Sequence, residues 1–105
     1  MRKEIIKTLV DLCMEINGLS PRTAEEPGGL PTVFYSFSGH VGMFCIEVFL
    51  GGWKKEKLAA DMKWELYTDG GNFNIERYEN AYGSLLALRD SVREREVAGA
   101  YAGND

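Results

Sequence analysis

The sequence predicts an α+β fold with the element order α-β-β-β-α, in which two helices pack on one face of a three-stranded antiparallel sheet. Apolar residues recur at helical spacing near both ends of the chain and alternate with polar residues through its middle. Glycine-rich turns separate the alternating segments. A length of 105 residues is typical of one domain. We therefore expect a single α+β domain over residues 1–96 and a flexible tail over residues 97–105.

Helices are predicted over residues 3–16 and 75–95. The first has a stop signal at Asn17-Gly18, because both residues tolerate the left-handed conformation of a helix end. Its apolar stripe consists of Ile5, Leu9, Leu12, Cys13 and Ile16. The second helix can be capped by Asn74. Its apolar stripe consists of Tyr78, Tyr82, Leu85, Leu88 and Val92. Gly83 either costs this helix about 1 kcal/mol relative to Ala or allows close packing on the sheet.

Strands are predicted over residues 32–38, 41–50 and 62–68, because these segments alternate and are rich in β-branched and aromatic residues. The first two strands should form a hairpin across Gly39. The second strand has one uniformly apolar face, which we expect to be buried with the matching sides of its neighbours. This buried set is Phe44, Ile46, Val48 and Leu50, with Val33, Tyr35 and Phe37 on the first strand.

The opposite face of the sheet should remain open, because two helices on one side leave the other side uncovered. Its aromatic and acidic composition is typical of a protein interface. The candidate binding residues are Phe34, Met43, Glu47, Phe49, Glu65 and Tyr67. Two alternatives are left open. The tail or the long connection at residues 18–31 covers this face, or the chain forms a homodimer through this face or a sheet edge.

Charge and cysteine content restrict the partners and the compartment. Sixteen acidic and twelve basic residues give a net charge of -4, which disfavours direct binding to nucleic acid. Cys13 and Cys45 match no metal-binding or redox spacing, so we expect both to be reduced. No segment reaches the roughly 18 apolar residues of a membrane span, and the N-terminus does not resemble a signal peptide. We expect a cytoplasmic protein without membrane contact.

No pattern in the sequence indicates a catalytic, cofactor-binding or metal-binding site, so we expect no enzyme activity. His40 is the single histidine and belongs to a predicted turn. No residue beside it in the sequence supplies a nucleophile, so we interpret it as a turn or capping residue and not as a general base. Asp61, Glu65 and Asp69 match no calcium-loop spacing and are interpreted as solvated carboxylates. Three glycine pairs lack the features of dinucleotide-binding and phosphate-binding loops, and we interpret them as turn residues.

A small basic cluster follows Trp53 and provides the main argument for nucleic-acid binding. It consists of Lys54, Lys55 and Lys57. An aromatic residue beside positive charges can bind single-stranded nucleic acid. The acidity of the whole chain favours a solvated loop at this position instead.

The α-β-β-β-α order resembles the double-stranded-RNA-binding domain. Glycine and histidine in the first hairpin turn, within residues 31–49, add to this resemblance. Members of that family begin their second helix with lysines that contact phosphates. The corresponding residues here are Asn74-Ile75-Glu76-Arg77. The resemblance therefore implies the topology without RNA binding.

A second resemblance covers residues 33–67. The stretch Tyr35-Ser-Phe-Ser-Gly-His-Val41, followed by an alternating strand and Gly52-Trp53, is similar to small uncharacterised bacteriophage and prophage proteins. This resemblance implies a phage setting and the cytoplasm of a bacterial host. Small acidic proteins in that setting often inhibit host machinery, anti-CRISPR proteins among them. The preferred hypothesis is a protein-binding module that inhibits a host protein or a defence complex such as CRISPR. The alternatives are a nucleic-acid-binding module and a homo-oligomeric phage structural protein.

Overall fold

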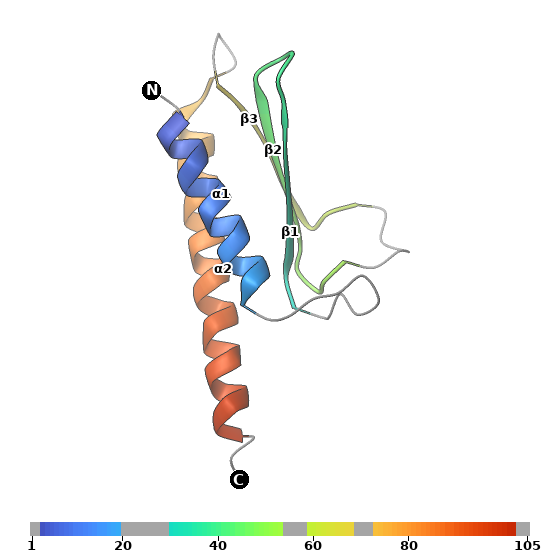
Figure 1. Cartoon of the computed structure of the whole chain (residues 1–105), viewed down its shortest axis with the longest axis vertical. Coiled ribbons are helices and arrows are strands. Elements are labelled where there is room, and N and C mark those ends of the chain that lie inside the picture. Colours follow the sequence, from blue (N-terminus) through green and yellow to red (C-terminus); the bar gives the residue numbers. More distant parts are fainter. Residues whose placement is uncertain (1–2, 20–29, 54–58, 69–72, 103–105) are drawn as a thin grey trace.

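The predicted fold class and element order are confirmed by a computed structural model of the chain. The described residues are 3–19, 30–53, 59–68 and 73–102. The elements are α1 (Lys3–Gly18), β1 (Thr32–Ser38), β2 (Met43–Phe49), β3 (Met62–Tyr67) and α2 (Ile75–Ala102). Both helices lie on one side of the sheet, so the molecule has two layers (Figure 1).

The sheet has the order β1-β2-β3, and both pairs of neighbouring strands are antiparallel. Its register places Ile46 opposite Tyr35 on one side and opposite Trp64 on the other. Residues that lie directly opposite each other share a face. The helix-facing row positions are therefore Val33, Tyr35, Phe37, Phe44, Ile46, Val48, Met62, Trp64 and Leu66. This apolar set is the side that the alternation in the sequence predicts.

The core lies between this face and one stripe of each helix. In α1 the buried residues are Leu9, Leu12, Cys13 and Ile16, as the helical spacing predicts. In α2 they are Tyr78, Ala81, Leu85 and Val92. Tyr82 was predicted in this stripe but is exposed, because the smaller Ala81 occupies the position that faces the core. Glu15 of α1 forms ion pairs with Arg89 and Arg93 of α2, which connect the helices outside the core.

Several predicted boundaries differ from the structure. β2 is shorter than predicted, and Leu50 is exposed after its end rather than buried. The chain turns there because the amide of Gly52 donates to the carbonyl of Phe49, at 3.1 Å. α1 extends two residues past its predicted end, and α2 continues to Ala102, so residues 97–102 are helical. The mobility of the tail stays a prediction. A methyl group at Gly83 would have open space around it, so close packing does not explain this glycine.

α1 contacts β1 closely at only one end. The Asn17 side chain donates from Nδ2 to the Val33 carbonyl and accepts from the Val33 amide at Oδ1, both at 2.8 Å. From there α1 diverges from β1 toward the tip of the β1–β2 hairpin (Figure 1). This divergence leaves Tyr35 40% and Phe37 55% exposed, although both lie on the helix-facing side of the sheet. Their predicted burial is therefore wrong.

The turn between β1 and β2 depends on Gly42. Its φ of 60° lies in the left-handed region, and a Cβ atom there would come within 2.8 Å of the Thr68 hydroxyl oxygen. The Gly42 carbonyl accepts hydrogen bonds from the amide and the hydroxyl of Thr68, at 2.9 and 3.1 Å. The hairpin tip is thereby fixed to the end of β3. Within the described part of the chain, neither helix is apolar enough over a sufficient length to cross a membrane.

Candidate functional site

All six candidate binding residues lie on the sheet face that points away from the helices. Phe34 pairs with Glu47, Cys45 pairs with Glu65, and Met43 pairs with Tyr67, which places these positions on one side. Among the described residues no helix crosses this face, and the extension of α2 continues on the opposite side (Figure 1). The C-terminal helix therefore does not cover it. Most of the connection at 18–31 lies outside the described residues.

A hollow of about 370 Å³ occupies the end of this face at which β1 begins. It brings together three of the candidate residues, Phe34, Glu47 and Phe49, and adds residues that the prediction omitted. The full lining is Phe34, Tyr35, Ser36, Cys45, Glu47, Phe49 and Trp53. Met43 and Tyr67 lie toward the other end of the face. The candidate site is therefore concentrated in one half of the predicted patch.

Four aromatic residues line the hollow, and Phe34, Phe49 and Trp53 form most of its apolar surface. Phe49 is only 7% exposed, and the ring of Phe34 stands edge-on to it, with centroids 5.5 Å apart and planes at 81°. Phe34 and Trp53 are 45% and 41% exposed. Phe49 was predicted as an accessible binding residue, but it forms the floor, while Phe34 and Trp53 offer the accessible surface. The position of Trp53 after the turn at 50–52 places it beside Phe49, and sequence alternation does not extend across that turn.

Carboxylates dominate the charge of this face. Glu47 and Glu65 are accompanied by Lys63, whose Nζ lies 3.5 Å from Oε1 of Glu65. Burial raises the pKa of the Cys45 thiol, the Glu47 carboxylate raises it further, and the opposite effect of Lys63 outweighs the small upward effect of Glu65. Cys45 is therefore a neutral thiol at neutral pH and not an activated nucleophile. The arrangement suits an apolar side chain next to a positive charge.

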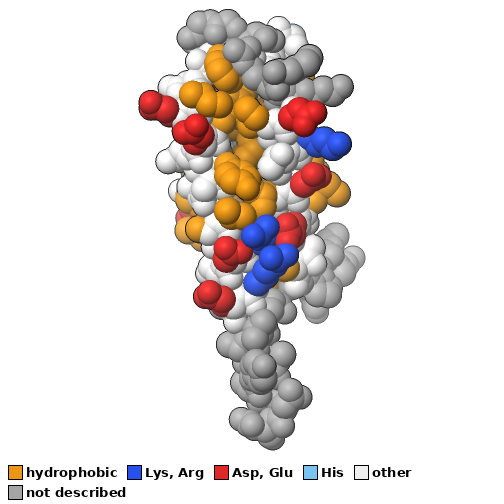
Figure 2. Space-filling model, turned by 90° about the vertical axis from the view of Figure 1, so that its left-hand side faces the viewer, with side chains coloured by type: hydrophobic (Ala, Val, Ile, Leu, Met, Phe, Trp, Pro, Cys, Tyr) orange, Lys and Arg blue, Asp and Glu red, His pale blue; other side chains and the backbone are white. Residues whose placement is uncertain are grey.

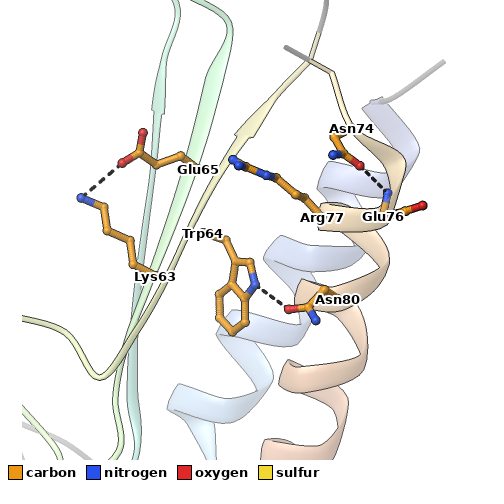
Figure 3. A pocket seen from close by; sticks show the side chains of 7 residues that line it. All are labelled: Lys63, Trp64, Glu65, Asn74, Glu76, Arg77 and Asn80. Atoms are coloured by element: carbon orange, nitrogen blue, oxygen red, sulfur yellow. Dashed lines mark hydrogen bonds and ion pairs between the residues drawn. The ribbon is translucent and has the colours of Figure 1, made fainter.

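A second groove, of about 650 Å³, runs between β3 and the start of α2 (Figure 3). Trp64 donates from Nε1 to Oδ1 of Asn80 across it, at 2.9 Å. Oδ1 of Asn74 accepts from the amide of Glu76 at 3.0 Å, which confirms the predicted cap. Figure 3 shows the Arg77 side chain reaching from the helix toward the strand. The candidate residue Glu65 lines this groove and not the hollow.

An apolar seam follows the outer side of the two helices (Figure 2). Acidic side chains border the hydrophobic ones in this view. A shallow cavity of about 290 Å³ lies along it, between Ile5 of α1 and Tyr82 of α2. The sequence predicted these residues as buried stripe positions, and the seam shows that the helices pack without covering them fully.

The remaining sequence candidates have structural roles or lie outside the description. His40 is exposed in the turn between β1 and β2. Asp61 is exposed, as its interpretation as a solvated carboxylate requires, and its Oδ2 also accepts from the amide of Leu50 at 2.7 Å across the β2–β3 connection. Both cysteines are free, and burial raises the pKa of Cys13 to about 12. Asp69 and the basic cluster Lys54, Lys55 and Lys57 lie outside the described residues. Within the description, no three His, Cys, Asp or Glu side chains converge as metal ligands would.

Comparisons with protein-family models, with curated proteins and with solved structures found no match.

Proposed function

We propose that this chain is a protein-binding module that holds a segment of a partner on the open face of its sheet. The observation that supports this proposal is the hollow, which has an apolar floor at Phe49, exposed aromatic rings at Phe34 and Trp53, and a carboxylate at Glu47. Aromatic residues in a partly enclosed apolar site are the usual anchors of protein interfaces. The matching partner segment has one large apolar side chain with Lys or Arg beside it.

The exposed surface of the hollow can support weak to moderate binding. Covering the exposed parts of Phe34 and Trp53 removes roughly 160 Å² from water, which corresponds to about 4 kcal/mol before the costs of association. A charge-assisted contact of Glu47 with a basic group adds specificity more than affinity. The two carboxylates of the face disfavour a phosphate backbone, so the charge supports a protein partner over a nucleic acid.

The similarity of residues 33–67 to phage and prophage proteins supports a finer proposal. In a phage setting the partner is a host protein, and the chain acts as an accessory protein that inhibits host machinery. The net charge of -4 supports a target with a basic surface, such as the nucleic-acid-binding parts of a defence complex like CRISPR. An inhibitor of this kind needs a binding face and no catalytic residues.

A displayed library of random peptides tests the binding proposal without a known partner. We expect the wild-type chain to enrich peptides with an aromatic or large aliphatic residue flanked by Lys or Arg. Glu47→Lys combined with Glu65→Lys should weaken the selected peptides at least about tenfold, and Trp53→Ala should weaken them by a similar factor. Phe49 is unsuitable for this test, because truncation of a buried ring also destabilises the fold.

The matched control is Glu79→Lys combined with Glu94→Lys, which makes the same charge change on exposed positions of α2. This control should bind the selected peptides within about twofold of the wild type, apart from long-range effects that salt screens. Equal losses in the two double variants would show that net charge, and not the open face, determines binding. A library that yields no enriched peptide would count against the proposal.

A further inference from the structure

The outer edge of β1 has a short row of backbone groups with no partner among the described residues. The amide and carbonyl of Val33 both bond to Asn17, so they point away from β2. Backbone direction alternates along a strand, so the amides and carbonyls of Tyr35 and Phe37 also point outward. Within the described chain, no group donates to or accepts from these four backbone atoms. They can pair with another strand.

The side chains around this edge are uncharged and exposed. Tyr35 and Phe37 flank it on the helix-facing side, and Phe34 flanks it on the open side. β1 contains no acidic or basic residue. Natural sheets usually protect an edge with charges, prolines, bulges or a covering segment. Over Phe34 to Ser38, the described part of the chain shows none of these devices.

We propose that a second copy of this chain adds its own β1 to this edge, antiparallel, about a two-fold axis at Ser36. Tyr35 then pairs with Phe37 of the second copy, and Phe37 pairs with Tyr35 of the second copy. Each pair exchanges two backbone hydrogen bonds, so the outward amides and carbonyls of Tyr35 and Phe37 find partners in both copies. The product is a continuous six-stranded sheet in which the helices of both copies lie on the same side.

The structure favours the register with its axis at Ser36 over registers whose axis lies elsewhere along β1. An axis at Tyr35 would pair Phe37 with Val33 of the second copy, whose backbone groups are already bonded to Asn17. An axis at Phe37 would pair Tyr35 with Gly39, which lies in the turn after β1 ends at Ser38. An axis between two residues would set an outward-facing residue against an inward-facing one. Only the axis at Ser36 satisfies both free residues.

The same geometry favours a second copy over an unrelated strand. The free edge is bounded by Asn17 at one end and by the turn at the other, so its two available residues form a set that is symmetric about Ser36. The aromatic side chains repeat this symmetry, because each Tyr35 meets a Phe37 on the helix-facing side. Each copy has a net charge of -4, but β1 carries no charged residue. Pairing at this strand therefore places no like charges directly opposite each other.

The interface is small, so the dimer should be weak. The exposed parts of three aromatic rings amount to roughly 300 Å² per copy, which is well below a standard interface. We expect a dissociation constant of about 10 µM to 1 mM at physiological salt. Higher salt should strengthen the dimer, because it screens the repulsion between two acidic chains. A partner held by opposite charge would show the reverse dependence.

Sedimentation of the full chain over a range of concentrations, up to about 1 mM, tests the proposal. Ser36→Asp and Ser36→Lys each place two like charges opposite each other at the axis, about 4.5 Å apart between Cα atoms. Each variant alone should dimerise at least about tenfold more weakly than the wild type. An equimolar mixture of the two variants should restore the dimer, because the mixed pair joins opposite charges. Circular dichroism checks that both variants fold.

Asn74→Asp is the matched control, because it adds one negative charge at the start of α2 and keeps a capping oxygen. It should dimerise like the wild type, whereas the Glu47→Lys and Glu65→Lys variant that tests peptide binding should dimerise at least as strongly, because it removes the net negative charge that separates the copies. A wild-type chain that stays monomeric at the highest concentration would overturn the proposal. A dimer that ignores both Ser36 substitutions, or a mixture that fails to restore association, would overturn it as well. Peptide binding is measured separately, so either result can fail alone.

Discussion

The two outer edges of the sheet differ in how they are protected. Along β3 the outward carbonyl of Tyr67 accepts a hydrogen bond from the hydroxyl of Tyr78, at 2.8 Å, and the outward positions Lys63 and Glu65 are charged. α2 also runs beside β3, with Trp64 bonded to Asn80 between them. Along the part of β1 from Val33 to Ser38, the described residues cover the outer edge at Val33, through Asn17. The β3 edge is closed to strand addition by several devices, and the β1 edge by one.

This difference indicates that the helices protect the sheet unequally although they lie on the same side of it. Side chains of α2 bond to β3 at both Trp64 and Tyr67, whereas in the described residues side-chain bonds from α1 reach β1 at Val33 alone. An edge whose strand is apolar and uncovered is an association site by default. The contrast between the edges can be tested by removing one protecting group at a time.

The largest effect is expected for Asn17→Ala. The substitution removes two hydrogen bonds and leaves the part-buried amide and carbonyl of Val33 without them. We expect the free energy of unfolding to fall by about 2 kcal/mol, measured by urea denaturation. Asn80→Ala is the control, because it removes a single exposed bond to Trp64 and should cost less than about 1 kcal/mol. Equal losses would show that Asn17 is not a special support of β1.

A smaller effect is expected for Tyr78→Phe at the other edge. The ring stays in the core, and the hydroxyl donor to the Tyr67 carbonyl is lost. We expect a loss of about 1 kcal/mol, visible as a lower Tm in thermal unfolding. Tyr82→Phe makes the same chemical change on an exposed ring and should alter stability by less than about 0.5 kcal/mol. A loss in Tyr82→Phe as large as in Tyr78→Phe would contradict the role of the edge bond.

The smallest effect on stability is expected for Lys63→Gln combined with Glu65→Gln. Their ion pair is exposed, so its loss should change the free energy of unfolding by less than about 0.5 kcal/mol. The double variant should nevertheless aggregate faster, because the charges oppose strand addition at β3. Light scattering during prolonged incubation measures this. Unchanged scattering would assign the protection of this edge to α2 and Tyr78 instead of the charges.

Alternation along the strands was sufficient to predict which residues share a face. The open-face positions of Phe34, Glu47 and Tyr67 follow from a period of two residues, and the register confirms them. Alternation does not determine how far a helix extends over the sheet. Tyr35 and Phe37 were therefore assigned to the correct side but to the wrong environment, because α1 diverges before it reaches them.

Contacts between residues distant in sequence escaped prediction for a different reason. Asn17 is of a residue type that often ends a helix, and nothing nearby in the sequence indicates that its side-chain amide bonds to Val33. The bond from the Leu50 amide to Asp61 likewise depends on the pairing of β2 with β3. Trp53 joins the hollow only because the chain reverses at Gly52, whose φ is 86°. Such contacts are set by the tertiary fold and have no local pattern.

Asn17 has one further consequence. Its amide group imitates the backbone of a neighbouring strand and occupies the position at which a longer incoming chain would continue. An added strand can therefore use only the distal part of β1. Because β3 carries Lys63 and Glu65 at its outer edge and the Tyr67 carbonyl is bonded to Tyr78, we expect no further strand to add there. Asn17 thus limits where the second strand can pair, and the two-fold pairing of β1 with β1 closes the assembly at two copies.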